Sequence, residues 1–288
     1  MNDISKVILG TVQFGLNYGI NNSIGKPSKN KVFEILDFAF TSGIKTLDTA
    51  NAYGNSELLI GEYIETRKQT EFNVCSKFNV SIDIENIIKS TLSRLNSKKL
   101  YSFSFHNYDC YKSAADLEIE KLLKHKQNGI IEKIGVSIYT NEQLREVINC
   151  SWIDVIQLPY NLLDCNFEKV TLLKLAKSKQ KIIHSRSAFL QGLFYMDINN
   201  LPLKLIPLMP YLKLIDSIAF ENNVSKNQLA LNFVLQNSYI DKVLIGVDTV
   251  EQLSENLNCI TTLNSKVLNQ IEAIDVKENE LLNPANWN

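Results

Sequence analysis

Four side chains with complementary proton chemistry follow three successive short apolar segments of this chain. Asp48 and Tyr53 follow the first segment, Lys77 ends the second, and His106 follows the third. A phenol ordinarily loses its proton only near pH ~10, and an ammonium a few ångström away lowers that pKa. An imidazole can hydrogen-bond a carbonyl oxygen and fix its direction. Together the four residues predict a site that delivers a proton from Tyr53 to an oxygen.

Asp48 and Lys77 have electrostatic roles in this hypothesis. A lysine buried among apolar side chains needs a counter-charge, and Asp48 is placed to supply it. Taken alone, each of the four has a simpler interpretation: a turn-capping aspartate, a packing tyrosine, a solvated lysine or a core histidine. We favour the joint interpretation because all four follow or end predicted strands.

Short apolar segments rich in Ile and Val alternate with helical patterns along the chain. Strands that are buried on both faces have this composition. A stripe from Ile84 to Leu95 has the spacing of an amphipathic helix, and Thr140, Ser225 and Thr249 each open a capping-box pattern. The predicted strands are 7–9, 44–47, 72–75, 101–105, 133–136, 154–158, 181–184 and 242–245.

Repetition of strand and helix eight times over about 250 residues predicts an α/β fold, a (β/α)8 TIM barrel, as a single domain over 1–288. In such a barrel the four residues point to one mouth. An open doubly wound sheet is the alternative, which the absence of Gly-x-Gly-x-x-Gly after the first strand disfavours for a dinucleotide-binding protein. We expect a long loop after strand seven, about 187–210, to hang over the mouth, and a C-terminal tail at about 277–288.

The composition excludes several classes of function. Thirty basic and 31 acidic side chains give a net charge of −1, which provides no electrostatic basis for binding nucleic acid or an anionic membrane. The chain shows no 18-residue apolar run and no secretion signal, and its five cysteines are widely spaced, so we expect a cytoplasmic protein with free thiols. Three histidines without a His-x-His pair argue against a metal site.

The segment around Tyr53 resembles a known family. Asp48, Tyr53 and the following Gly54, Ser56 and Glu57 have the spacing of the aldo-keto reductase signature. Lys77, at the end of the third predicted strand, and His106, after the fourth, correspond to the lysine and histidine of that family's catalytic tetrad. Further segments resemble the family's later strands, its penultimate helix and its adenosine segment: 135–137, 156–161, 191–193, 228–231, 245–246 and 255–256.

This resemblance implies an NAD(P)-dependent oxidoreductase that transfers a hydride between a nicotinamide dinucleotide and a carbonyl or alcohol. Tyr53 would then be the general acid/base. Ser137 and Gln157 would hold the nicotinamide carboxamide, which needs a donor and an acceptor, although both could instead bond neighbouring backbone. The implied cofactor-binding set is Ser137, Gln157, Arg186, Ser187, Gly246, Asp248, Gln252, Glu255 and Asn256.

Two positions depart from the family pattern. Arg186 stands where members usually stack a tyrosine on the nicotinamide; a guanidinium can also stack on a ring, or it can reach an anionic group. NADP(H) is the family's default cofactor, but Asp248 lies in the loop after strand eight, and Gln252 stands where an arginine is common. We expect weak discrimination, with NAD(H) as the alternative, because a carboxylate repels a 2′-phosphate but accepts a bond from a free ribose hydroxyl.

The substrate pocket is expected between the loops after strands one, four and seven and the C-terminal tail. Trp287 either folds across the mouth or belongs to a disordered tail. The alternatives to a reductase are a non-catalytic nicotinamide-binding sensor or regulatory subunit and a metal-dependent hydrolase; the oligomeric state stays open. A small hydroxylated carbonyl substrate, a sugar or nucleotide sugar, is favoured by Phe14, Asn17, Tyr18, Asn107, Tyr108 and Asp109.

Overall fold

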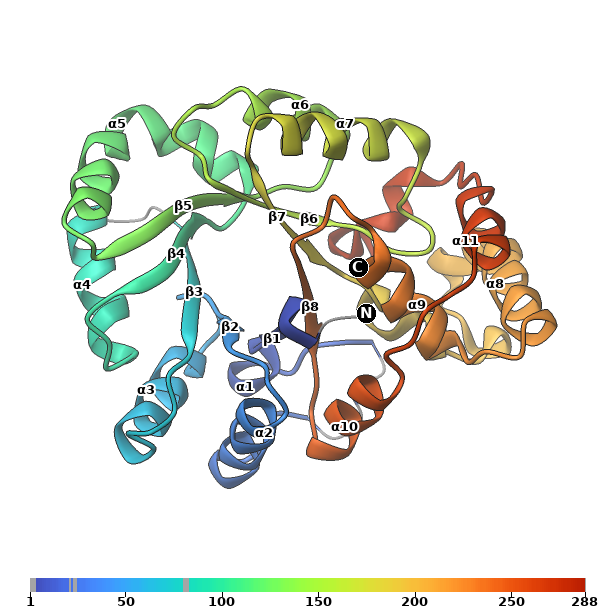
Figure 1. Ribbon diagram of the computed structural model, residues 1–288, viewed down its shortest axis with the longest axis horizontal. Coiled ribbons are helices and arrows are strands. Elements are labelled where there is room, and N and C mark those ends of the chain that lie inside the picture. Colours follow the sequence, from blue (N-terminus) through green and yellow to red (C-terminus); the bar gives the residue numbers. More distant parts are fainter. Residues whose placement is uncertain (1–3, 21, 23–24, 80–82, 288) are drawn as a thin grey trace.

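Eight parallel strands close into a barrel in the computed structural model, which describes residues 4–20, 22, 25–79 and 83–287 (Figure 1). Each strand pairs with the next along the chain, and β1 pairs with β8 from Val7↔Val243 to Gly10↔Gly246. This closure confirms the predicted barrel and excludes the open sheet. The strands are β1 (Val7–Gly10), β2 (Thr46–Asp48), β3 (Asn73–Phe78), β4 (Leu100–Phe105), β5 (Ile131–Ser137), β6 (Val155–Pro159), β7 (Ile182–Arg186) and β8 (Lys242–Gly246).

Helices lie around the outside of these strands (Figure 1). Thr140 and Ser225 begin their helices with complete capping boxes, as predicted. Thr249 also caps its helix, but the side chain of Gln252 accepts the backbone N–H of Asp248 at 2.7 Å. The helices are α1 (Val12–Gly15), α2 (Lys29–Thr41), α3 (Ser56–Thr66), α4 (Ile84–Arg94), α5 (Tyr108–Gln127), α6 (Asn141–Ile148), α7 (Phe167–Ser178), α8 (Met209–Glu221), α9 (Lys226–Gln236), α10 (Val250–Asn258) and α11 (Ser265–Glu272).

The main apolar layer lies between the outward faces of the strands and the inward faces of the helices. Phe103 of β4 pairs with Ile134 of β5, and both side chains are fully buried. The predicted stripe of α4 faces this layer, with Ile84 and Leu95 fully buried. None of the helices in the described part of the chain has the length and apolar character needed to cross a membrane.

The carboxyl ends of the strands meet at one rim, which is the mouth of the barrel. The register places Gly10 beside both Asp48 and Gly246. Further around the rim, Ser137 pairs with Gln157. Segments that are distant in sequence therefore converge because a parallel barrel aligns all its strand ends.

The segment after β7 is ordered into short 3-10 helices. These are η2 (Leu190–Tyr195), η3 (Ile198–Asn200) and η4 (Leu203–Leu208), and α8 follows directly. The tail forms η5 (Asn279–Leu282) and η6 (Pro284–Asn286), and another 3-10 helix, η1 (Ile4–Lys6), precedes β1. Residues 1–3 and 288 of the predicted domain lie outside the described residues.

Candidate active site

Backbone contacts position the loop that carries Tyr53. Gly54 has a φ of +55°, and a Cβ atom there would lie 2.5 Å from the carbonyl oxygen of Gly15. A Cβ on Gly15 would in turn lie 1.7 Å from the carbonyl oxygen of Tyr53. Only glycine permits this approach and this backbone angle together. The two glycines thus allow the loop after β2 to pack closely against α1.

Ser56 and Glu57, which belong to the signature, form hydrogen bonds that fix the position of the same loop. The Ser56 hydroxyl lies 3.0 Å from the carbonyl oxygen and 2.8 Å from the side-chain oxygen of Thr11. The buried Glu57 carboxylate accepts hydrogen bonds from Ser76 at 2.6 Å and from Arg94 Nε at 2.7 Å. These bonds join α3 to the N-terminus of α1, to β3 and to α4, so the signature residues that flank Tyr53 have structural roles.

Asp48 and Lys77 form a buried ion pair at the mouth. Their side chains are each 3% exposed, and Lys77 Nζ donates to Asp48 Oδ1. Gln157 Nε2 donates to the other carboxylate oxygen at 2.8 Å. Burial lowers the pKa of the Lys77 ammonium, but the Asp48 carboxylate and the Tyr53 phenol together outweigh burial, so this pKa lies above its ordinary value. The Lys77 ammonium therefore keeps its proton at neutral pH.

Tyr53 and His106 lie next to the Asp48–Lys77 ion pair. Lys77 Nζ lies 5.2 Å from the centre of the Tyr53 ring, and the Tyr53 and His106 rings meet edge-to-face with centroids 5.7 Å apart. Burial raises the pKa of the Tyr53 phenol above its ordinary 10.0, and the Lys77 ammonium lowers it by less. The prediction that the pKa of the Tyr53 phenol is lowered is thus wrong, because the net shift of this pKa is upward. A phenol in this environment carries its proton at neutral pH.

His106 is a neutral imidazole at physiological pH. Burial, helped by the Lys77 charge, lowers its pKa to about 4. Its Nδ1 is buried and has no partner among the described residues. A neutral imidazole has one N–H donor, which suits a hydrogen bond to a carbonyl oxygen rather than proton transfer.

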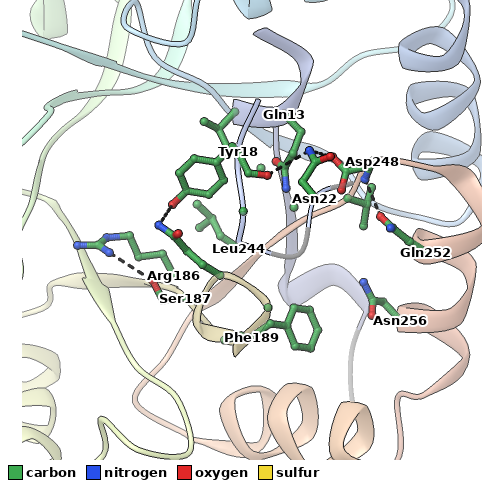
Figure 2. A pocket seen from close by; sticks show the side chains of 18 of the residues that line it. Gln13, Tyr18, Asn22, Arg186, Ser187, Phe189, Leu244, Asp248, Gln252 and Asn256 are labelled. Carbon is green, nitrogen blue, oxygen red and sulfur yellow. Dashed lines mark hydrogen bonds between the residues drawn. The ribbon is translucent and has the colours of Figure 1, made fainter. Parts of the chain in front are cut away.

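One cavity of about 440 Å³ opens from this site toward the loops after β7 and β8 (Figure 2). Asp48, Tyr53 and Gln157 line one end, which we call the proton-donor end together with Lys77 and His106. Asp248 and Asn256 line the other end, which we call the nucleotide end. The remaining predicted residues that line it are Arg186, Ser187, Gly246, Gln252 and Glu255.

Polar groups inside the cavity fit a nicotinamide dinucleotide. Gln13 is 8% exposed, lines the cavity, and has a buried Oε1 with no partner among the described residues. Its amide lies so close to Gly246 that a Cβ there would meet Gln13 Nε2 at 2.5 Å. Gln157 also has a free Oε1 in the described part of the chain, since only its Nε2 is bonded. Unsatisfied amides in an elongated cavity are suited to a ligand with many hydrogen-bonding groups.

The nucleotide end carries acidic side chains, and a hydrogen bond between two loops closes it. Asn22 Nδ2 donates to Asp248 Oδ1 at 3.1 Å, which joins the loop after β1 to the loop after β8 (Figure 2). Burial raises the pKa of the Asp248 carboxyl above its ordinary value. Glu255 also lines this end, whereas Arg186 is the one cationic side chain among the described residues that line the cavity.

A chain of polar side chains continues from Asn256. Its Oδ1 accepts a hydrogen bond from Asn227 at 3.1 Å, and the Tyr195 hydroxyl donates to Asn227 Oδ1 at 2.5 Å. The Phe189 and Tyr195 rings lie 5.7 Å apart. Aromatic faces beside amide groups are suited to a planar heterocycle.

The structure separates three predicted residues from the lining of this cavity. Lys77 lies beneath Asp48, and His106 beside Tyr53. Ser137 is 4% exposed at the end of β5, next to Gln157 in the register. Sequence analysis noted Gln191 only as part of the family-like segment 191–193 and did not predict it as a site residue, although it lines the cavity. Four further residues that line the cavity were not singled out for the site: Gln13, Asn22, Tyr195 and Asn227.

Parts of the expected substrate pocket are wrong. Phe14 is fully buried in the core, and the Tyr108 hydroxyl is bonded to Glu146 on the outer surface. Trp287 is part-buried, its Nε1 donates to the carbonyl oxygen of Leu281 at 2.8 Å, and described tail residues do not line the cavity. Tyr18 does line it. An aromatic residue near a strand end packs inward or outward according to backbone direction, which its type alone does not reveal.

A closed eight-stranded barrel with this site at its mouth defines a barrel oxidoreductase. The model of the aldo/keto reductase family matches residues 6–276, and the chain belongs to that family. The chain is 25% identical to the uncharacterized oxidoreductase YqkF of Bacillus subtilis, covering 88% of this chain and 87% of the relative. It is 28% identical to L-galactose dehydrogenase of Arabidopsis thaliana, covering 82% and 81%.

Among solved structures, the aldo-keto reductase AKR11C1 from Bacillus halodurans has the same fold. The TM-score is 0.76 at 20% identity, and the match covers 95% of this chain and 94% of that one. Family membership and these oxidoreductase relatives support NAD(P)-dependent carbonyl reduction.

Proposed function

We propose that this protein reduces the carbonyl group of a sugar, or oxidises the corresponding alcohol, with Tyr53 as the general acid/base. The observation that carries the proposal is the juxtaposition of Tyr53, His106 and the buried Lys77–Asp48 pair at one end of an elongated polar cavity. A protein that only bound a dinucleotide would have no need of a buried ion pair beneath a phenol.

Each residue has a role in the reducing direction. His106 donates a hydrogen bond to the carbonyl oxygen because its imidazole is neutral. Tyr53 holds the proton that this oxygen receives, and its raised pKa keeps that proton in place at neutral pH. Lys77 then stabilises the tyrosinate left behind, and Asp48 fixes the lysine. Such acid catalysis typically contributes about 10²–10⁴-fold in rate.

The residues along the cavity are suited to holding the cofactor. Gln157 and Ser137 would hold the carboxamide, and Gln13 and Gly246 the middle of the dinucleotide. When bound, the reduced nicotinamide supplies the hydride that the carbonyl carbon accepts. The protein's contribution is orientation and the exclusion of water.

We further propose that NAD(H) is preferred over NADP(H). Asp248 and Glu255 give the nucleotide end two carboxyl groups, and Arg186, the one cation among the described residues that line the cavity, lies at the other end. A 2′-phosphate there would meet repulsion and no cation from the described lining residues, whereas a ribose hydroxyl can donate to the carboxyl of Asp248. Asn22 holds that carboxyl in place.

A sugar is the proposed substrate class, and the cytoplasm the proposed compartment. Tyr18, Asn22 and Gln191 place polar groups around the cavity, and the name of one relative, L-galactose dehydrogenase, specifies a sugar. The five cysteines are free thiols, which supports a reducing compartment.

The experiment that tests this function is a panel of aldoses, keto-sugars and simple aldehydes assayed by loss of reduced nicotinamide absorbance. NADH and NADPH are compared for each substrate, with Tyr53→Phe as the matched variant. We expect turnover by the native protein, faster with NADH, and none above background with the variant. Tight NADH binding without turnover of any carbonyl would favour the non-catalytic sensor instead.

A further inference from the structure

Arg186 is held rigidly at the end of β7. Its guanidinium carbon lies 4.0 Å from the centre of the Tyr139 ring. Its Nη2 donates to the carbonyl oxygen of Ile138 at 3.1 Å, and its Nη1 lies 3.3 Å from the Ser187 hydroxyl. A guanidinium fixed by stacking and two hydrogen bonds loses little conformational freedom when it binds a ligand.

The charge of Arg186 lacks a carboxylate partner within the described residues. The three other arginines of the chain each pair with a carboxylate: Arg67 with Asp37, Arg94 with Glu57 and Arg145 with Glu168. Exposed arginines find such partners readily, so a half-buried arginine without one is unusual for this molecule.

The guanidinium also has unused donors. It carries five N–H groups in a planar fork, and the two described above have acceptors. The other three have no acceptor in the part of the chain that the structure describes. That fork matches the two oxygens of a carboxylate or phosphate.

Arg186 faces the space where a substrate would meet Tyr53. It lines the same cavity as Tyr53 and Tyr18, and Figure 2 shows its side chain reaching past Ser187 on the side away from Asp248. Its charge influences the pKa of Tyr53, Tyr18 and His106. A group bound by Arg186 therefore lies at the proton-donor end, far from the acidic nucleotide end.

We propose that Arg186 binds an anionic group, a carboxylate or a phosphate, carried by the carbonyl substrate. This inference rests on the proposed reductase function and narrows its substrate to acidic sugars. The anion would complete the charge balance of a site in which Lys77 is already neutralised by Asp48. Charge-assisted hydrogen bonds of this type correspond to about a tenfold to hundredfold gain in affinity.

The test compares D-galactose, D-galacturonate and D-galactose 6-phosphate as substrates. We expect the native protein to favour at least one charged sugar in kcat/KM by tenfold or more. Arg186→Gln should abolish this preference mainly through KM, and Arg186→Lys should restore part of it. Arg145→Gln, which removes an arginine of the outer surface, is the matched control and should keep the preference.

Two binding measurements distinguish a failure of the anion-site inference from a failure of the proposed reductase function. NADH affinity is titrated by fluorescence, and we expect less than a twofold change in Arg186→Gln; a loss above tenfold with the preference retained would assign Arg186 to the cofactor and overturn the inference. D-Galactonate, which has no aldehyde to reduce, should raise the melting temperature of the native protein–NADH complex but not of Arg186→Gln.

Binding of galactonate that depends on Arg186, without turnover of any sugar, would uphold the anion site while the reductase function fails. Turnover of neutral and charged sugars at equal rates, unchanged by Arg186→Gln, would overturn the anion site and leave the reductase function intact.

Discussion

The two ends of the cavity are built from different kinds of structure. At the proton-donor end, Asp48 and Lys77 lie within strands and are fixed by buried bonds. At the nucleotide end, contacts such as Asn22 to Asp248 join side chains of separate loops. The comparison teaches that the barrel strands position the groups proposed for the chemistry, whereas the groups proposed to recognise the nucleotide lie on loops, which tolerate sequence change better than strands do.

The backbone shows the same contrast. The segment after β7 contains three consecutive residues with positive φ: Leu190 at 46°, Gln191 at 53° and Gly192 at 92°. Gln191 holds the Tyr18 hydroxyl from this segment through a 2.9 Å bond. Strained backbone is kept where surrounding contacts compensate for it, and such segments cluster at ligand sites.

The largest expected effect is a fall in kcat caused by a substitution that changes the proton-donor end alone. Tyr53→Phe removes the proton and leaves the nucleotide end untouched, so kcat should fall by about 10²–10⁴-fold while NADH affinity stays within twofold. Steady-state kinetics with a fluorescence titration measures both. A fall in NADH affinity equal to the fall in kcat would show that the two ends are not separable.

Lys77→Met tests whether the buried pair supports chemistry as well as stability. Removal of one partner leaves Asp48 buried with Gln157 alone, so the free energy of unfolding should fall by about 3–5 kcal/mol. Lys169→Met breaks a second buried pair, with Asp164, whose side chains are 5% and 10% exposed. Urea denaturation should show similar losses for both variants, but only Lys77→Met should abolish turnover of the folded fraction.

His106 should act through its hydrogen bond and not through its charge. His106→Phe is expected to lower kcat/KM by about 10²-fold or more, and His106→Gln, which keeps an N–H donor, should lose less. Because its pKa is about 4, the imidazole stays neutral above pH ~5 and charges only below that. A pH–rate profile with a step near pH ~6.5 that disappears in His106→Gln would contradict this assignment.

The smallest effect concerns the nucleotide end. Asp248→Ser should shift the ratio of NADPH to NADH activity toward NADPH by about fivefold, since a partly exposed pair of charges interacts by about 1 kcal/mol, and kcat with NADH should change little. Glu251→Gln removes an acid from the first turn of α10, the helix that follows Asp248, at a position outside the cavity lining, and should leave the ratio unchanged. Native preference for NADPH by a hundredfold would refute the role given to Asp248.

Sequence reasoning was most successful where a local pattern and a global rule coincide. Every predicted strand overlaps an observed one, and Asp48 and Tyr53 were found because strand ends of a parallel barrel converge. It failed for Phe14 and Tyr108, whose side chains point into the core and to the outer surface. The net pKa of Tyr53 was also missed, because burial depends on neighbours from several strands.

The sequence by itself determined the barrel and the family, and it predicted the residues proposed to deliver the proton. Apolar periodicity and a spaced signature are local properties, so they can be read without coordinates. Only the tertiary structure decided that Arg186 lacks a carboxylate partner among the described residues and that Asn22 meets Asp248 across 226 positions. Such facts depend on distances between loops, which are set by the closure of the whole barrel and leave no trace in the local pattern.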